Sequence, residues 1–355
     1  MIRILLVHPT PTRGGFTAVV SQAFELVKTG RFEVAVACQP GERVRELPPA
    51  SKVVYLQEPL MSFRGVCRLR RAILTSNPHF VHFHGRKAGF IGRLVLPRSC
   101  QQNRVLYTPH GTPWVGQSFI RQFAGDFAER LLLDRTGAVL CVSHHEVEEW
   151  CRRDSSEKIH YLPNPVPPIR DIHQPQCPID EKPTGTVLVP SGYNPQKRIE
   201  VVLEALALLR PPRPHTSIVG AVDRPGYRDY LVQLAARLGI RGDVTFGSNI
   251  SDIRSALRDA SLVVLPSYSE GFPIVGQEAI AEGARVAWSR IGAHTELFGE
   301  TGAPFWTATD LAKILAGDHA KASVADRQLW LSRYARDVEK IRASYWNELA
   351  KSVEE

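Results

Sequence analysis

The chain lacks several patterns that commonly define a site or a compartment. It contains no C-x-x-C pair, no D-x-D triplet and no low-complexity segment, and its longest apolar stretch, near 90–96, is interrupted by Arg93. A membrane-spanning helix needs about 18 or more apolar residues, so none is expected. The first residues enter a strand at once, without a small-residue cleavage site. We therefore expect no secretory signal and a cytoplasmic location.

Cysteine is scarce, with six residues at positions 38, 67, 100, 141, 151 and 177. Their spacing matches neither a disulfide framework nor a zinc site, so we expect reduced thiols. His82 and His84 stand two apart on a predicted strand and therefore point to one face. Two ligands do not complete a metal site, so no metal is expected here. We expect these histidines to line a cleft and to form hydrogen bonds with a substrate.

Positive charge is concentrated in the first half of the chain. Residues 1–160 carry 22 basic and 13 acidic groups, whereas the remainder carries 22 and 23. Within 52–104, ten basic residues accompany a single acid, Glu58. Such asymmetry favours a polyanionic partner (nucleic acid, anionic lipid or a phosphorylated ligand) or is simply a solvated basic surface. No nucleic-acid-binding motif accompanies it, so no nucleic-acid partner is expected.

The length of 355 residues predicts about two domains. Short β-rich apolar runs alternate with helical patterns, which predicts right-handed βαβ units and mainly parallel sheets. Seven prolines within 163–183 suit neither a helix nor an inner strand. The predicted fold class is α/β with two Rossmann-like domains, at 1–165 and 185–325, joined by a proline-rich linker at 166–184. The predicted strands are 2–8, 32–38, 52–56, 79–84, 105–109, 138–142 and 159–162, then 186–190, 215–219, 244–246, 262–266 and 285–289.

A long helix is predicted for 326–355, beginning at Asp326. Its apolar residues recur at steps of three or four and form one stripe that must pack on something: Trp330, Tyr334, Val338, Ile341, Tyr345 and Leu349. A shorter helix is predicted at the segment Ser143-His144-His145-Glu146. Although this segment contains a serine beside a histidine, as in a hydrolase, a simpler interpretation is a capping box formed by Ser143 and Glu146.

Residues 63–77 predict a basic amphipathic helix. Its arginines Arg64, Arg68 and Arg71 recur at steps of four and three, and its apolar residues are Val66, Leu69, Ile73 and Leu74. Such a helix is suited to an anionic membrane surface, or else packs on a core with a solvated basic face. We assign these three arginines, with Arg86 and Lys87, to the acceptor or membrane side of the protein.

Residues 262–283 carry the strongest chemical pattern. An apolar strand leads into a turn at Gly271, which a glycine permits, and then into a helix. Pro273 suits the first helical position because its missing N–H would be unpaired there anyway. The free amides of Ile274 and Val275 then lie at the positive end of the helix dipole, which suits a phosphate. Glu270 and Glu278 lie about two turns apart, so both can border one ligand.

Glu270-Gly271-Phe272-Pro273 followed by Glu278 resembles the E-x7-E signature of glycosyltransferase family 4, whose members are retaining enzymes of the GT-B fold. Other segments agree in order and extend the resemblance over nearly the whole chain. In the first half, Arg13-Gly14-Gly15 is similar to a glycine-rich donor loop, Val81-His82-Phe83-His84 is similar to the V-H-x-H strand end, and His110-Gly111-Thr112 is similar to the H-G turn. Further along, residues 161–166 are similar to I-P-N-G-V with Pro165 in place of glycine, residues 244–247 to the base-side turn, and residues 292–296 to G-G-x-x-E. The resemblance implies two Rossmann-like domains whose parallel sheets face a cleft. It also implies a terminal helix that packs back on the N-terminal domain.

The resemblance implies roles for individual residues. Glu270 would contact the hydroxyls of the transferred sugar, and Glu278 the ribose of the nucleotide. Lys197 would neutralise the leaving diphosphate, and His110 would reach the sugar near the reacting carbon. The donor would also be held by Gly14 and Gly15, by Arg198, and by the segment Gly271, Phe272, Pro273, Ile274 and Val275.

One position departs from the family pattern. Where the family has Gly-Arg, this chain has Ser191-Gly192, so the arginine that accompanies the lysine on the diphosphate is absent. Arg198, Arg13 or Arg86 would supply the second positive charge, or else the donor is held less tightly or the chain is not an active transferase. With no D-x-D present, we expect no metal and no cofactor, and positive protein groups take the place of a metal clamp.

The expected function is a retaining hexosyltransferase-type enzyme. It would move a sugar from a nucleotide diphosphate-sugar to a carbohydrate or lipid-linked acceptor, in bacterial surface polysaccharide or lipopolysaccharide assembly, at the inner face of the membrane. Two alternatives stay open. One is a nucleotide-sugar epimerase of the same architecture. The other is a non-catalytic protein that binds nucleotide sugars.

Overall fold

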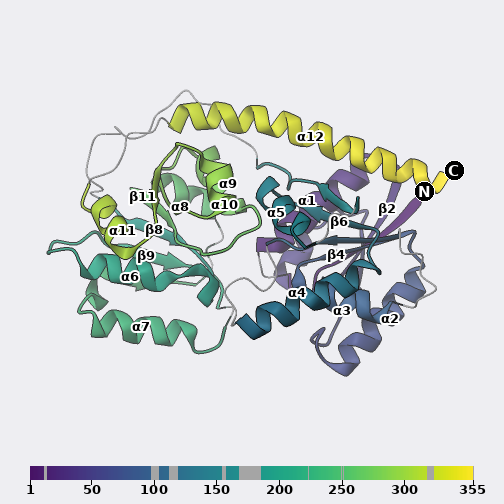
Figure 1. Cartoon of the computed structure of the whole chain (residues 1–355), viewed down its shortest axis with the longest axis horizontal. Coiled ribbons are helices and arrows are strands. Elements are labelled where there is room, and N and C mark those ends of the chain that lie inside the picture. Colours follow the sequence, from purple (N-terminus) through teal and green to yellow (C-terminus); the bar gives the residue numbers. More distant parts are fainter. Residues whose placement is uncertain are drawn as a thin grey trace. The chain divides into compact units, whose positions relative to one another are not determined.

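The computed structural model describes residues 1–11, 14–96, 104–111, 119–153, 157–167, 185–222, 224–248, 250, 252–317 and 324–354. The chain divides into two compact units, one formed by Met1–Pro165 with Asp337–Glu355 and the other by Val166–Arg336 (Figure 1). Each unit has a parallel sheet with helices on both faces, so the predicted α/β class with two Rossmann-like domains is confirmed. The predicted linker lies outside the described residues from position 168 onward.

The sheet of the first unit has seven strands in the order β3-β2-β1-β4-β5-β6-β7. They are β1 (Ile2–Val7), β2 (Phe32–Cys38), β3 (Lys52–Tyr55), β4 (Phe80–His84), β5 (Val105–Thr108), β6 (Ala138–Cys141) and β7 (Ile159–Tyr161). All pairings are parallel, with Ile4 beside Phe80 in the central pair. The chain moves outward from β1 to β3 and then returns to β4 on the other side of β1. Ligands of open α/β sheets bind at such a reversal, beyond the carboxyl ends of the strands.

Helices cover both faces of this sheet (Figure 1). The core on one face joins the strands to α1 (Gly14–Lys28) and to the last part of α12 (Val324–Glu354). On the other face the core includes residues of α2 (Phe63–Ser76), α3 (Arg86–Val95), α4 (Phe119–Leu133) and α5 (His144–Cys151). A short 3-10 helix, η1 (Glu42–Glu46), precedes β3. The sheet is thereby buried on both sides, as its nearly continuous apolar strands require.

The long helix α12 belongs to both units, since the division falls between Arg336 and Asp337. The predicted apolar stripe identifies only part of the side of α12 that packs on the first unit. Its most deeply buried positions in the first unit are Val338, Arg342, Trp346 and Ala350, whereas Ile341, Tyr345 and Leu349 are half-buried. The predicted stripe shares only Val338 with this buried line, which continues through the charged residue Arg342 and so departs from the apolar periodicity.

Arg342 is buried because its partners surround it. Its guanidinium donates to both carboxylate oxygens of Glu25 on α1, at 2.5–3.1 Å, and to the carbonyl of Pro163 at 2.6 Å. The indole of Trp346 donates to the same carboxylate at 3.1 Å. A buried charge with this many hydrogen bonds is compensated, so the end of α12 is held firmly on α1.

The sheet of the second unit has six strands in the order β10-β9-β8-β11-β12-β13. They are β8 (Val187–Pro190), β9 (Thr216–Val219), β10 (Val244–Phe246), β11 (Leu262–Leu265), β12 (Val286–Ser289) and β13 (Ala303–Phe305). The short strand β13 was not predicted. It lies at the sheet edge and has Pro304 at its centre, which is tolerated there because an edge strand need not donate from every position.

The helices of the second unit are α6 (Ile199–Ala207), α7 (Tyr227–Arg237), α8 (Ile253–Asp259), α9 (Ile274–Ala281), α10 (Gly292–Phe298) and α11 (Ala308–Leu315), with 3-10 turns η3 (Pro195–Lys197) and η4 (Arg241–Asp243). No helix in the described ranges of the chain is both long and apolar enough to cross a bilayer. Four of the six cysteines fall within the described ranges, and all four are free thiols.

Replacing Trp346 by alanine tests the attachment of α12. The side chain is almost completely buried, so Trp346→Ala should lower the free energy of unfolding of the first unit by about 3–5 kcal/mol. Chemical denaturation followed by circular dichroism measures this loss. The matched control is Trp306→Ala, since that tryptophan is 58% exposed and should change stability little. Equal stabilities of the two variants would contradict the packing described.

Candidate functional site

The strand order of the second unit reverses between β8 and β11, which are neighbours in the sheet. The segments that follow these two strands therefore emerge at the same edge, at the position where open α/β sheets bind ligands. Backbone and side-chain hydrogen bonds join them. Tyr268 donates its N–H to the carbonyl of Gln196 at 3.1 Å, and the side-chain amide of Gln196 donates to the carbonyl of Ser269 at 2.6 Å.

Lys197 and Glu270 meet at this edge. The ammonium group of Lys197 lies 2.5 Å from Oε1 of Glu270, and the hydroxyl of Ser267 donates to the same oxygen at 2.7 Å. Both charged side chains keep partial exposure, 26% for Lys197 and 15% for Glu270. The site therefore presents a positive and a negative group together, both reachable from solvent.

The ionisation of Glu270 follows from these contacts. Burial by itself raises the pKa of the carboxyl group, but the charge of Lys197 and hydrogen bonds from Lys197 and Ser267 lower it, and the net result is a pKa below the usual value. Glu270 is therefore a carboxylate at neutral pH, and so it can accept hydrogen bonds from sugar hydroxyls.

His294 supports this site from α10, and the sequence did not single it out as a site residue. Its Nδ1 lies 3.0 Å from the carbonyl of Ser289, and the hydroxyl of Ser289 donates to the carbonyl of Ser267. Burial lowers the pKa of His294 to about 4, so the ring is neutral at pH 7. Nε2 of the ring is buried and has no hydrogen-bond partner in the part of the chain that the structure describes. His294 lies within the segment from Gly292 to Glu296 that resembles G-G-x-x-E, but at a position that this motif leaves open, so only the tertiary contacts reveal it.

The helix that follows Glu270 begins one residue later than predicted. Pro273 is the N-cap with extended backbone, and Ile274 is the first residue of α9. The prediction of Pro273 at the first helical position was wrong by one residue, a difference within the usual uncertainty of helix ends. Gly271, Phe272 and Pro273 are buried, whereas Ile274 and Val275 are half-buried at the amino end of the helix, and Glu278 is half-buried further along it.

The position of the absent arginine is occupied by Gly192, which has no side chain, and the buried Ser191 precedes it. Ser191 is 6% exposed, and its hydroxyl has no hydrogen-bond partner among the described residues. Of the candidates for a second positive charge, Arg198 follows Lys197 directly and donates to the carbonyl of Trp306 at 3.3 Å. Arg86 lies on α3 of the first unit, and Arg13 lies outside the described residues. In the second unit, Arg198 is therefore the candidate that adjoins the ion pair.

The first unit gathers four histidines at the carboxyl ends of its central strands. The rings of His82 and His84 lie 3.9 Å apart between centroids, which confirms that they point to one face. Nδ1 of His84 lies 3.1 Å from Nε2 of His110, which follows β5. His8 follows β1 and is buried, and Gly15 on α1 lies so close that a Cβ atom there would come within 3.0 Å of the His8 ring.

His82, His84 and His110 are held neutral. Burial lowers the pKa of His82 and of His84 well below the ordinary value, and lowers that of His110 to about 4. His82 is fixed between Gln22 and Thr108, at 2.9 and 2.8 Å. In the described ranges, no group of three or more histidine, cysteine, aspartate or glutamate side chains is arranged to hold a metal ion. The cluster therefore presents neutral donors and acceptors beside His110.

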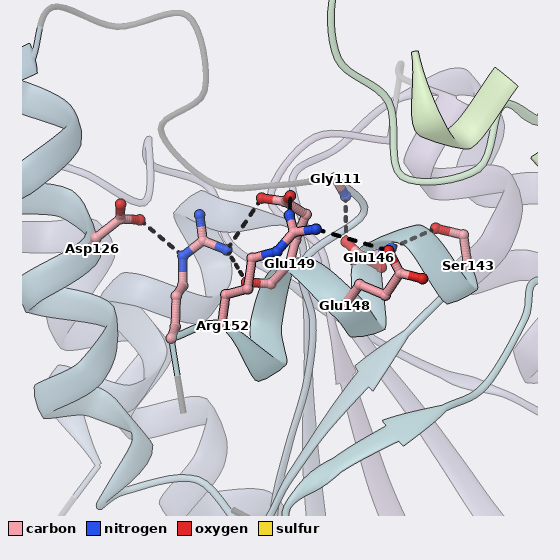
Figure 2. A network of polar contacts seen from close by, with 8 residues as sticks. Gly111, Asp126, Ser143, Glu146, Glu148, Glu149 and Arg152 are labelled. Atoms are coloured by element: carbon pink, nitrogen blue, oxygen red, sulfur yellow. Dashed lines mark hydrogen bonds and ion pairs between the residues drawn. The ribbon is translucent and has the colours of Figure 1, made fainter. Parts of the chain in front are cut away.

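The turn at His110 is held by a buried carboxylate. His110 has a φ of 58°, a left-handed conformation that a residue with a side chain adopts only when its surroundings hold it there. Glu146 supplies this support, because it accepts the N–H of Gly111 at 2.7 Å (Figure 2). It also accepts the N–H of Val142 at 2.7 Å. Ser143 caps α5 through the N–H of Glu146, as predicted, but the Glu146 carboxylate reaches across to the His110 turn.

The remaining predicted positions lie as follows. Gly14 is the first residue of α1, so the glycine pair lies in the first helical turn and not in a loop before it. Arg64, Arg68, Arg71, Arg86 and Lys87 are all exposed on α2 and α3. Lys197, Arg198, Glu270 and Glu278 belong to the second unit, and His110, Gly14 and Gly15 to the first. The structure thus brings together Lys197 with Glu270, and His110 with His84.

Comparison with known proteins places each half of the chain in a described family. Residues 12–170 match the family described as Glycosyltransferase Family 4, and residues 170–322 match Glycosyl transferases group 1. D-inositol 3-phosphate glycosyltransferase of Mycobacterium tuberculosis is 36% identical over 119 residues, which cover 32% of this chain. The match spans about a quarter of the length of that relative.

Solved structures agree with the fold over almost the whole length. HepE of Anabaena in complex with UDP and glucose superposes with a TM-score of 0.75 at 19% identity, covering 99% of this chain and 100% of that one. WaaG, a glycosyltransferase involved in lipopolysaccharide biosynthesis, superposes with a TM-score of 0.67 at 14% identity, covering 96% and 95%. At these identities the likeness establishes the shared GT-B fold.

The neutral state of His294 predicts a pH dependence of stability. As pH falls from 7 to 5, the unfolded chain protonates this residue near its ordinary pKa of 6.5, whereas the folded chain does not until about pH 4. The unfolded state therefore binds more protons, and the folded state loses about 2 kcal/mol from this residue over that range. Denaturant unfolding of the wild type and of His294→Asn at both pH values measures the difference. A variant with an undiminished loss of stability would show that His294 is not held neutral.

Proposed function

Because the chain belongs to glycosyltransferase family 4, we propose that it transfers a sugar from a nucleotide diphosphate-sugar to an acceptor. The observation that carries this proposal is the meeting of Lys197 with Glu270 directly before the amino end of α9. A donor of this class carries a charged diphosphate beside a ring of hydroxyl groups. A lysine, a carboxylate and a helix start within one site match that combination of groups.

Binding of the donor would rearrange the ion pair. The diphosphate would compete with Glu270 for the ammonium group of Lys197, and the carboxylate so released would turn to the sugar hydroxyls. Negative charge grows on the diphosphate as the bond to the sugar breaks, so a lysine and helix amides placed there stabilise the transition state more than the ground state. Arg198 adjoins this position and is our candidate for the second positive group.

The other roles follow the family signature. Glu278 would bind the ribose, and the segment from Gly271 to Val275 would hold the sugar and the diphosphate. His110, supported by His84 and by the Glu146 contact to Gly111, would act on the sugar near the reacting carbon. We propose that no metal and no cofactor take part, since lysine and helix amides supply positive charge.

The stereochemistry, the acceptor and the cellular role are proposed from the resemblance to glycosyltransferase family 4 and from similar solved structures. We propose a retaining enzyme that acts on a carbohydrate or lipid-linked acceptor in the assembly of a bacterial surface polysaccharide or lipopolysaccharide, in the cytoplasm at the membrane face. The name of WaaG and the UDP and glucose bound in HepE support this choice. UDP-glucose is accordingly the first donor to test.

Lys197→Ala tests the site directly. Loss of its charge should lower the rate of nucleotide release from UDP-glucose, or from whichever nucleotide sugar the wild type accepts, by at least about a hundredfold. Coupled detection of the nucleoside diphosphate measures this rate, and mass spectrometry of the products identifies a glycosylated acceptor. The matched control is Lys313→Ala, an exposed lysine on α11 of the same unit. Unchanged turnover in Lys197→Ala would mean that the diphosphate is held elsewhere, and a free epimerised nucleotide sugar would indicate an epimerase.

Donor binding can be measured without an acceptor. A ligand that binds only the folded state stabilises it by about 2.7 kcal/mol at a hundredfold excess over its dissociation constant. Thermal unfolding with UDP, GDP, ADP and their sugar conjugates should therefore raise the melting temperature for one base, and Glu278→Ala should reduce that shift. Stabilisation without turnover of any sugar conjugate would favour a binding protein over an enzyme.

A further inference from the structure

Helix α4 has an unusual distribution of side chains. Its exposed residues include Ile120, Phe123, Phe127 and Leu131, which are 57–78% exposed and recur at steps of three or four. They therefore form one stripe along a single side of the helix. A helix at the surface of a globular protein normally turns its apolar stripe inward.

Two acidic side chains of α4 turn toward the protein, beside the buried Leu132 and Leu133. Glu129 is fully buried and pairs with Arg93 of α3 at 2.5 Å, and Asp126 pairs with Arg153 at 2.9 Å. Arg93 is held further by the carbonyl of Gly89 and by the ring of Tyr107. A buried ion pair is strongly unfavourable to break, so α4 cannot rotate to hide its apolar stripe.

The neighbouring helices extend this surface and add positive charge. Helices α2, α3 and α4 lie side by side on one face of the sheet, with contacts from α2 to α3 and from α3 to α4 (Figure 1). Leu69 and Ile73 of α2 point to the core, so its opposite side faces outward. That side exposes Phe63 (82%) and Leu74 (57%) among four exposed arginines and no acid: Arg64, Arg68, Arg70 and Arg71.

We propose that the outward sides of α2 and α4 bind an anionic membrane, with Phe123 and Phe127 entering the interface of the bilayer. Aromatic and aliphatic side chains surrounded by arginines are the composition of interfacial helices, whose apolar face is buried while basic groups meet lipid phosphates. Exposed Arg86 and Lys87 on α3 and Arg130 on α4 carry the same sign of charge. This charge favours a lipid surface over a second copy of the chain, because two such faces would repel each other.

Binding to a membrane follows from this surface alone. Its use depends on the proposed function, since the enzyme would meet a lipid-linked acceptor at this surface. The sequence directed attention to the basic helix α2. The structure adds α4. Its apolar stripe can be assigned to the exposed side only because the structure shows that Glu129 and Asp126 on the same helix pair with arginines of neighbouring segments.

The test is sedimentation of the full chain with phosphatidylcholine vesicles, with and without phosphatidylglycerol. The wild type should bind the anionic vesicles and release at high salt, and the double variant Phe123→Ser/Phe127→Ser should lower the partition coefficient by at least about tenfold. The matched control is Phe24→Ser, a half-exposed phenylalanine on α1 that should bind like the wild type. Since Phe123 and Phe127 are exposed, their replacement should leave the far-ultraviolet circular dichroism unchanged.

Three results would overturn the proposal. The first is a wild type that binds neither kind of vesicle, and the second is a double variant that binds as tightly as the wild type. The third is a wild-type dimer that the double variant dissociates, which would show that the stripe covers a second copy. Nucleotide release from UDP-glucose without lipid separates this proposal from the proposed function, because the double variant should keep that rate. Vesicle binding without turnover would leave the surface established and the transferase proposal wrong.

Discussion

The ion pair between Lys197 and Glu270 joins the segments that follow two neighbouring parallel strands, β8 and β11. These residues are 73 positions apart in the sequence, and they meet because the strand order reverses between the two strands. Each group satisfies the other when no donor is bound, which limits the cost of holding charges at a partly buried site. A ligand that separates the pair must offer Lys197 an anion and Glu270 a hydrogen-bond donor. The pair therefore favours a ligand that carries a phosphate beside hydroxyl groups.

The two units place different chemistry at equivalent positions. In the second unit the strand ends carry opposite charges, whereas in the first they carry the neutral histidines His82, His84 and His110. Neutral rings suit the first unit, because further positive charge on an already basic half would raise the cost of burial. The left-handed turn at His110 is held by Glu146, a buried acid that takes two backbone amides. The position of the His110 ring is therefore set both by these backbone contacts and by the contact of its own Nε2 with His84.

Acids that are buried or half-buried also explain how the first unit obtains its basic surface. Glu25, Glu129 and Glu146 are each engaged by arginine or by backbone amides, so their charges are neutralised or turned inward. Removing one partner of a buried pair such as Arg93 with Glu129 typically costs about 3–5 kcal/mol, so these contacts hold helices in fixed rotations. Helix α2 itself contains no acidic residue, and its exposed face carries arginines. The same inward contacts of the acids therefore remove negative charge from the surface of the first unit and fix the orientation of its helices.

The sequence by itself determined the α/β class and the segment Glu270 to Glu278. It also determined, to within a residue or so, twelve of the thirteen strands found in the described part of the chain. Alternating apolar runs and a helix start depend on near neighbours in the chain, so they can be seen without the tertiary structure. The sequence did not reveal β13, the buried line through Arg342 and Trp346, the support from His294, or the outward stripe of α4. Each of these depends on a partner distant in sequence. A local pattern records which residues are apolar, but only the strand order and the buried ion pairs decide which side of a helix faces the core.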